Sequence, residues 1–163
     1  MDLLDRLLAN DRWNTGRILQ LSRGLSESEF NQPFDVGHQT LGATLEHMIF
    51  SLEVWAAAMA GEPMPDQTAE SSPEAWSDRH ERAAASFAVL ARQLSDQQRL
   101  DDTFLDPWIE AATPRTFGTT IVHVLLHNAQ HRNEALHILQ RLGVANLPDG
   151  DPKEWEEATQ AIN

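Results

Sequence analysis

The sequence predicts an all-α protein, a four-helix bundle with long first and third connections. Four long segments of the 163-residue chain repeat apolar residues with the 3.6-residue period of a helix, and none shows the strict alternation of a half-buried strand. Proline, glycine and capping residues separate these segments. A chain of this length corresponds to one domain, so we expect a single bundle domain over residues 1–163.

The first half of the chain contains two of these helices. Apolar residues at helical spacing predict the first from about Asp2 to Ser22. A capping box, Ser26-Glu-Ser-Glu29, then predicts a short helical turn. The second long helix is expected from near Thr40 to Met59, and Gly61 follows it. The segment Pro63 to Ser71 is expected to be a loop.

The second half repeats this organisation. Ser72-Pro73-Glu74 combines a capping serine with proline at the first helical position, and predicts the start of a third helix. A loop through Pro107 and Pro114 leads to a fourth helix, about Thr119 to Leu142, which Gly143 ends. The capping box Asp151-Pro-Lys-Glu154 predicts one short terminal helix.

Composition excludes several classes of partner. Lysine and arginine number 12 and aspartate and glutamate 25, so the net charge of −13 repels phosphate backbones and anionic lipid, and we expect no nucleic-acid partner. No apolar run approaches the roughly 20 residues of a spanning helix, and no signal segment opens the chain, so we expect no membrane partner and a cytoplasmic location. Without cysteine, histidine and carboxylate are the available metal donors.

His127 and His131 form the most informative pair in the chain. They stand four residues apart in the fourth predicted helix, so both rings project from one face. Two rings at this spacing can reach one ion at about 2.0–2.1 Å. The zincin proteases use the same spacing, but they require glutamate directly after the first histidine, where this chain has Asn128. The pair therefore predicts a metal site that is not a zincin site.

Helix phase supports a buried position for this pair. At about 100° per residue, His131 falls inside the inward stripe of the fourth helix and His127 at its edge. Buried imidazoles without partners cost a few kcal/mol, and a metal ion or a hydrogen-bond partner removes that cost. The alternative is that both rings are solvated or hydrogen-bonded at the surface. The stripe itself contains Val124, Ala135, Ile138 and Leu142.

His47 is the best candidate for a third ligand. It lies among small and apolar residues of the second helix, away from Glu46 and Glu53. The alternative is a histidine that is only packed in the core. Three ligands at i, i+4 and i+8 would span about 12 Å, so His123 is expected next to the site or on the surface. The other histidines are expected in a loop, in the core and in solvent; these are His38, His80 and His137 respectively.

Three short segments in the predicted helices carry a recognisable pattern. They are Asn10-Asp-Arg-Trp13-Asn14, Leu45-Glu-His47-Met and His127-Asn-Ala-Gln-His131-Arg132. Together they resemble the DinB-like superfamily of bacterial proteins, four-helix bundles with a three-histidine metal site, as does the tail Leu147-Pro-Asp-Gly-Asp-Pro-Lys-Glu-Trp155. The chain departs from that pattern at Asn133-Glu134, where many members have Gly-Gln.

The resemblance implies that His47, His127 and His131 are the metal ligands, the set that helix phase also favours. Some relatives are thiol-dependent transferases or isomerases that use a low-molecular-weight thiol. A divalent transition metal with an open coordination position, zinc or nickel, would lower the pKa of a bound water or thiol. We therefore expect a metal-dependent transferase or hydrolase acting on a small-molecule substrate, with Glu134 or Glu46 as the candidate general base.

Two other interpretations remain open. One is a stress-associated metal-binding protein without turnover, and the other is a bundle whose histidines are purely structural. Val122 and Leu126 point away from the inward stripe and, with five tryptophans in the chain, suggest a further apolar surface. A homodimer that buries this surface is expected, and it is compatible with every one of these functions.

Overall fold

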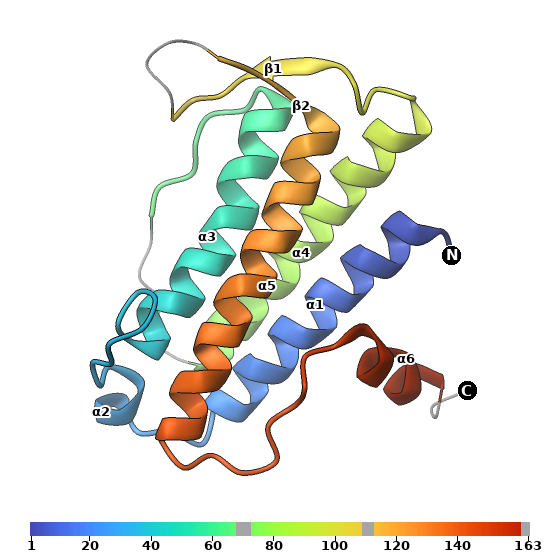
Figure 1. Ribbon diagram of the computed structural model, residues 1–163. Helices are drawn as coiled ribbons and strands as arrows, with labels where there is room; N and C mark the ends of the chain where they lie inside the picture. Colours follow the sequence, from blue (N-terminus) through green and yellow to red (C-terminus); the bar gives the residue numbers. More distant parts are fainter. Residues whose placement is uncertain (68–72, 109–112, 161–163) are drawn as a thin grey trace.

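Four long helices form the framework of the fold in the described part of the chain (Figure 1). The computed structural model describes residues 1–67, 73–108 and 113–160. Helices α1 and α5 run in one direction and α3 and α4 in the other; α1 packs against α4 and α5, and α3 likewise packs against α4 and α5. The all-α bundle with long first and third connections is confirmed. The long helices are α1 (Leu3–Ser22), α3 (Leu41–Ala60), α4 (Pro73–Asp96) and α5 (Phe117–Arg141).

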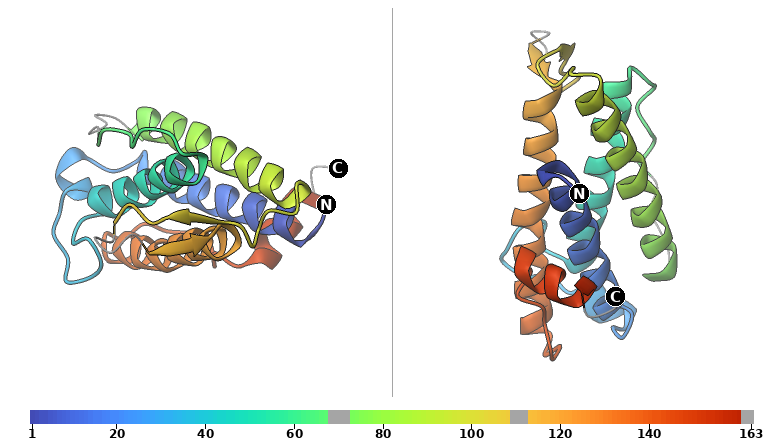
Figure 2. Two further views of the ribbon diagram at one scale, coloured as in Figure 1. Left: turned by 90° about the horizontal axis from the view of Figure 1, so that it is seen from above. Right: turned by 90° about the vertical axis from the view of Figure 1, so that its right-hand side faces the viewer.

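Short elements complete the two ends of the bundle. Helix α2 (Glu27–Phe30) lies in the first connection, and α6 (Pro152–Gln160) packs against α1. The third connection, expected as a loop, contains the antiparallel strands β1 (Thr103–Leu105) and β2 (Pro114–Thr116), with Phe104 opposite Arg115. This hairpin covers the end of the bundle where α3 ends and α5 begins (Figure 2). Strands of three residues are too short to show an alternating pattern in sequence.

Side-chain caps explain where the helices begin. Asp2, Thr40 and Thr116 each accept a hydrogen bond from the backbone N–H of the third residue of the helix that follows. Just beyond α5, Gly143 has φ +80°, the left-handed conformation that favours glycine. The predicted cap at Ser72 lies outside the described residues.

One hydrophobic cluster extends through the bundle. The face of α3 that points inward is fully buried, and the buried face of α5 matches the predicted stripe. Among the described residues, none of the helices combines the length and the apolar character needed to span a bilayer. The most deeply buried side chains of α3, α4 and α5 include Leu41, Leu45, Met48, Ile49, Leu52, Phe87, Ala91, Val124, Ala135, Ile138 and Leu139.

A buried polar layer joins α1 to α5, which the helical pattern of the sequence does not predict. The guanidinium of Arg132 on α5 donates to the carboxylate of Asp11 on α1, and both side chains are almost fully buried. The amide of Asn128 donates to the other carboxylate oxygen at 3.3 Å, and Arg132 also lies 3.4 Å from the hydroxyl of Thr15. These contacts give the buried charges partners and fix α1 against the helix that carries His127 and His131.

His80 on α4 packs in the core as expected and gives a first testable prediction. It is 2 % exposed, and its Nε2 has no hydrogen-bond partner among the described residues. Burial, together with the charges of Arg12 and Arg132, lowers its pKa to about 4. The unfolded chain, with a pKa of about 6.5, therefore binds more protons between these values, so stability present above pH 6.5 is lost as the pH falls towards 4.

We expect the His80→Leu variant to lose less stability than the parent protein on acidification. Between about pH 7.5 and about pH 4.5 the difference should be about 2 kcal/mol, measured by chemical denaturation of the metal-free proteins. A His137→Leu variant, altered at an exposed histidine, serves as the control. Parallel pH profiles for the parent and His80→Leu would contradict the assignment.

Candidate metal centre

Three histidines meet where α3 packs against α5. His47 lies on α3, and His127 and His131 lie on adjacent turns of α5. The Nε2 atom of His127 lies 2.8 Å from that of His47 and 3.2 Å from that of His131. The three pairs of ring centroids are separated by 4.7, 4.8 and 4.4 Å. The structure therefore brings the three sequence-predicted ligands to one point.

A carboxylate from the next turn of α5 holds one of these rings. Glu134 Oε2 lies 2.6 Å from His131 Nδ1 and accepts its hydrogen bond. With the proton on Nδ1, the lone pair of His131 Nε2 faces the cluster, the tautomer that a metal ligand requires. The second predicted base, Glu46, lies instead between α3 and α4, where it accepts a hydrogen bond from Arg79 at 2.8 Å. Of the two carboxylates, Glu134 is the one that contacts the histidines.

A fourth histidine, His38, expected only in a loop, also joins the cluster. The His38 ring centroid lies 4.0 Å from that of His47 and 5.1 Å from that of His131. One ring nitrogen from each of these three residues lies within 4.8 Å of the others, so this set can also hold a metal ion. Two overlapping trios therefore share His47 and His131, and differ in His38 or His127.

Packing of the loop before α3 explains why His38 reaches the cluster. Gly37 has φ +51°, and a Cβ atom there would lie 2.2 Å from Glu134 Oε2, so glycine allows the loop to rest on this carboxylate. Next to it, Asp35 pairs with Arg141, whose guanidinium carbon lies 4.7 Å from the ring centroid of Phe34. The loop is thus fixed against the last turns of α5.

The environment favours the neutral form of His38, His47 and His127. Burial, followed by the effect of the neighbouring rings of His38 and His127, lowers the pKa of His47 to about 4. Burial, followed by the effect of His131, lowers the pKa of His127 to about 4 as well. The pKa of His38 is also lowered, mainly by burial. Neutral imidazoles present the lone pairs that bind metal, so protons do not compete for them near neutral pH.

The remaining histidines on α5 lie outside the cluster. The His123 ring lies one turn before His127, with 5.7 Å between their centroids, and it packs edge-on against Trp55 at 5.8 Å. His123 is exposed and lies next to the site, as expected. His137, six residues beyond His131 on α5, is exposed to solvent, also as expected.

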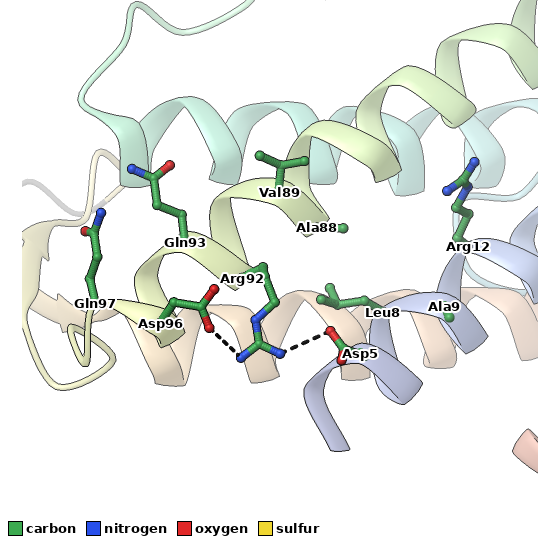
Figure 3. Close-up of a pocket in the computed structure, with 10 residues that line it drawn as sticks. All are labelled: Asp5, Leu8, Ala9, Arg12, Ala88, Val89, Arg92, Gln93, Asp96 and Gln97. Carbon is green, nitrogen blue, oxygen red and sulfur yellow. Dashed lines mark hydrogen bonds and ion pairs between the residues drawn. The ribbon is translucent and has the colours of Figure 1, made fainter. Parts of the chain in front are cut away.

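A separate cavity, of about 600 Å³, lies between α1 and α4 (Figure 3). Arg92 extends across it and pairs with Asp5 at 3.1 Å and Asp96 at 3.2 Å, so its charge is neutralised within the protein. Leu8 and Val89 add apolar walls. None of the residues that line this cavity is a histidine, so it is separate from the cluster between α3 and α5.

The donor set of the cluster fits a transition metal. Three nitrogens bound at about 2.0–2.1 Å in a tetrahedral arrangement lie about 3.3 Å apart, close to the 3.2 Å between His127 and His131 Nε2. Neutral imidazole suits zinc, nickel, copper and iron. The carboxylate of Glu134 behind His131 is the outer partner typical of such ligands.

Comparison with known proteins connects this fold to one family. Residues 11–135 match a family model described as the DinB superfamily. Among solved structures, a DinB-like protein from Bacillus cereus ATCC 10987 superposes with a TM-score of 0.65 and 16 % sequence identity, over 85 % of this chain and 89 % of that chain. This likeness shows a shared fold. No curated protein matches the chain.

Proposed function

The chain belongs to the DinB superfamily, and from that premise we propose that it is a metal-dependent enzyme acting on a small molecule. A divalent transition metal, zinc or nickel, is held by the Nε2 atoms of His47, His127 and His131. The observation that supports this most directly is the approach of these three nitrogens, with 2.8 and 3.2 Å separating His127 from its two neighbours. All three residues lie on long helices, which hold ligands more rigidly than loops do.

The carboxylate of Glu134 has a positioning role in this proposal. It accepts the Nδ1 proton of His131 and so keeps that ring oriented towards the other two. His38, carried by the loop that rests on Glu134, lies next to the cluster, with its ring centroid 4.0 Å from that of His47. When bound, the ion would lower the pKa of a nearby water or thiol. A low-molecular-weight thiol is the co-substrate we propose from the family, and the reaction is a transfer or a hydrolysis.

Metal content is the first test of this proposal. Protein purified without an affinity tag should contain about one transition metal per chain, and mild chelation followed by added zinc or nickel should remove and restore it. The loaded protein is then screened with small thiols and electrophilic acceptors for turnover. Absence of metal uptake would refute the proposal, and full metal uptake without turnover would favour the non-catalytic alternative.

Replacing Glu134 should weaken metal binding without removing it. We expect Glu134→Ala to reduce zinc affinity by about 10–100-fold, because His131 loses the partner that fixes its tautomer and orientation. Glu134→Gln, whose amide oxygen can still accept from Nδ1, should lose less. Competition with a chromophoric chelator measures both affinities, and Glu157→Ala, on the exposed surface of α6, is the matched control. Unchanged affinity in Glu134→Ala would argue against this role.

We further propose that two copies of the chain associate through the outer face of α5. Val122 and Leu126 are one turn apart on this helix, and 53 % and 66 % of their surfaces are exposed. Sedimentation should give a dimer for the parent protein and a monomer for Leu126→Asp, with metal content unchanged. A monomeric parent protein would refute the dimer and leave the metal proposal intact. A dimer that binds metal without turnover is the second candidate function.

A further inference from the structure

A small cavity lies between α3 and α5, on the side of the histidine cluster that faces the hairpin. Its volume is about 290 Å³, and it lies where α3 approaches its end, α5 begins and the hairpin covers the bundle. About ten water molecules, or an organic molecule with a similar number of non-hydrogen atoms, would fill it. The cavity is lined by Trp55, Asp106, Arg115, Thr119, Thr120 and His123.

This cavity lies beside the proposed metal centre, along the contact between α3 and α5. Trp55 lies two helical turns, about 12 Å, beyond His47 on α3, and His123 lies one turn, about 6 Å, before His127 on α5. Because α3 and α5 are antiparallel, these residues come together, with 5.8 Å between the rings of Trp55 and His123. His123 in turn lies 5.7 Å from His127. A molecule in the cavity therefore lies one histidine ring away from the cluster.

The cavity contains a guanidinium whose outer nitrogens are free to bind. Arg115 donates through Nε to Asp106 Oδ2 at 3.3 Å, and neither of its terminal nitrogens has a hydrogen-bond partner in the part of the chain that the structure describes. Asp106 is only 7 % exposed and is itself fixed by the backbone N–H of Trp108, at 3.0 Å. The side chain of Arg115 is 46 % exposed. The arginine is thus held at its base while its planar fork remains accessible.

The first turn of α5 adds a favourable field, but its first three backbone amides are already bonded. The amides of Phe117 and Gly118 donate to the carbonyls of Asp102 and Leu100, at 3.0 and 2.8 Å. The amide of Thr119 donates to the capping hydroxyl before it. The positive end of the helix dipole therefore favours a negative group here, and Arg115 supplies charged hydrogen-bond donors for it.

We infer that this cavity binds the carboxylate of a small organic acid, with Arg115 gripping the carboxylate through its terminal nitrogens and Trp55 and His123 contacting an apolar or planar body. The inference rests on the proposed function, because it places the reacting end of that substrate towards the histidine cluster. A planar carboxylate matches the fork of one guanidinium. A phosphate dianion would bring a second negative charge towards the buried carboxylate of Asp106, which makes it the poorer match.

Binding of benzoate tests this inference. Ligand-observed NMR and calorimetry compare benzoate with its neutral analogue benzamide, on metal-free and on zinc-loaded protein. We expect benzoate to bind both forms, benzamide to bind about tenfold or more weakly, and Arg115→Gln to lose about tenfold or more of the benzoate affinity. Arg115→Lys, which keeps the charge without the fork, should lose less. Arg23→Gln, altered at an exposed arginine at the other end of the bundle, should bind as the parent does.

The outcomes separate this inference from the metal proposal. Equal benzoate affinity in the parent and Arg115→Gln would overturn the inference, as would failure of benzoate, acetate and hexanoate alike to bind. Binding that requires zinc and ignores Arg115 would mean that the carboxylate goes to the ion, which overturns the cavity assignment and supports the metal centre. Binding lost in Arg115→Gln by a protein that takes up no metal would support the cavity and refute the proposed metal function.

Discussion

Replacing His131 by alanine is expected to abolish stable metal binding. This residue belongs to both histidine trios, its Nε2 lies 3.2 Å from that of His127, and its Nδ1 is held by Glu134. Loss of a direct ligand should cost more than the 10–100-fold that removal of an outer partner costs, so we expect the affinity to fall by more than about a hundredfold. Elemental analysis after dialysis against buffered zinc measures the effect.

The matched control is His137→Ala. His137 lies on the same helix, six residues further along, and is exposed, so this variant changes histidine content without touching the cluster. We expect it to retain the metal content of the parent protein. Equal metal content in the two alanine variants, whether high or low, would contradict the assignment of His131.

A second pair of variants decides between the two overlapping trios. If the helices supply all the ligands, His127→Ala should lose its metal while His38→Ala keeps it with at most a modest loss of affinity. The opposite result would mean that the loop supplies the third ligand, as the proximity of His38 to His47 and His131 allows. Circular dichroism checks that both variants fold. We expect them to fold, because neither His38 nor His127 belongs to the hydrophobic core.

Helix periodicity was sufficient to select most of the cluster. A spacing of four residues places His127 and His131 on one face, and the apolar surroundings of His47 on α3 indicated that it faces another helix. Glu134, named from the sequence as a candidate general base, lies one turn after His131 and accepts a hydrogen bond from its ring. These predictions succeeded because they depend only on the geometry within a helix and on the burial of apolar faces, both of which are local properties of the sequence.

His38 could not be found in this way, because a loop has no period. Its position depends on the left-handed conformation of Gly37 and on the close contact of that glycine with Glu134, almost a hundred residues further along the chain. The signal present in the sequence is a glycine directly before a histidine, close to a capping threonine. That pattern allows a sharp turn but does not specify which residues it packs against.

The polar layer between α1 and α5 was missed for a related reason. On the first helix, the apolar residues Leu3 and Leu7 are 73 % and 42 % exposed, whereas the polar residues Asn10, Asp11 and Asn14 are buried. A pattern of polar residues normally indicates the solvent face of a helix. Asp11 is buried with its partners Arg132 and Asn128 on α5, whereas the amide of Asn14 donates to the carbonyl of Asn10 within α1. Pairing between residues this far apart in the chain leaves no periodic trace in the sequence.

This layer gives the second large prediction, the loss of stability in Asp11→Ala. The variant leaves the guanidinium of Arg132 buried without its carboxylate partner. Breaking a buried ion pair from one side typically costs about 3–5 kcal/mol. For a protein of this size each kcal/mol corresponds to about 2–4 °C, so the melting temperature of the metal-free protein should fall by about 6–20 °C. Calorimetry measures this, and Asp101→Ala, at an exposed aspartate, should change it little.

The double variant Asp11→Leu/Arg132→Met tests whether the pair itself or its charge balance matters. Because two apolar side chains of similar volume avoid the desolvation of both charges, we expect the double variant to recover most of the stability lost in Asp11→Ala. Metal affinity then reports a different property. Arg132 follows His131 directly and fixes that turn of α5 against α1, so a stable double variant with weakened zinc binding would show that the pair positions the ligand. Recovery of stability together with unchanged zinc affinity would confine the pair to a role in folding.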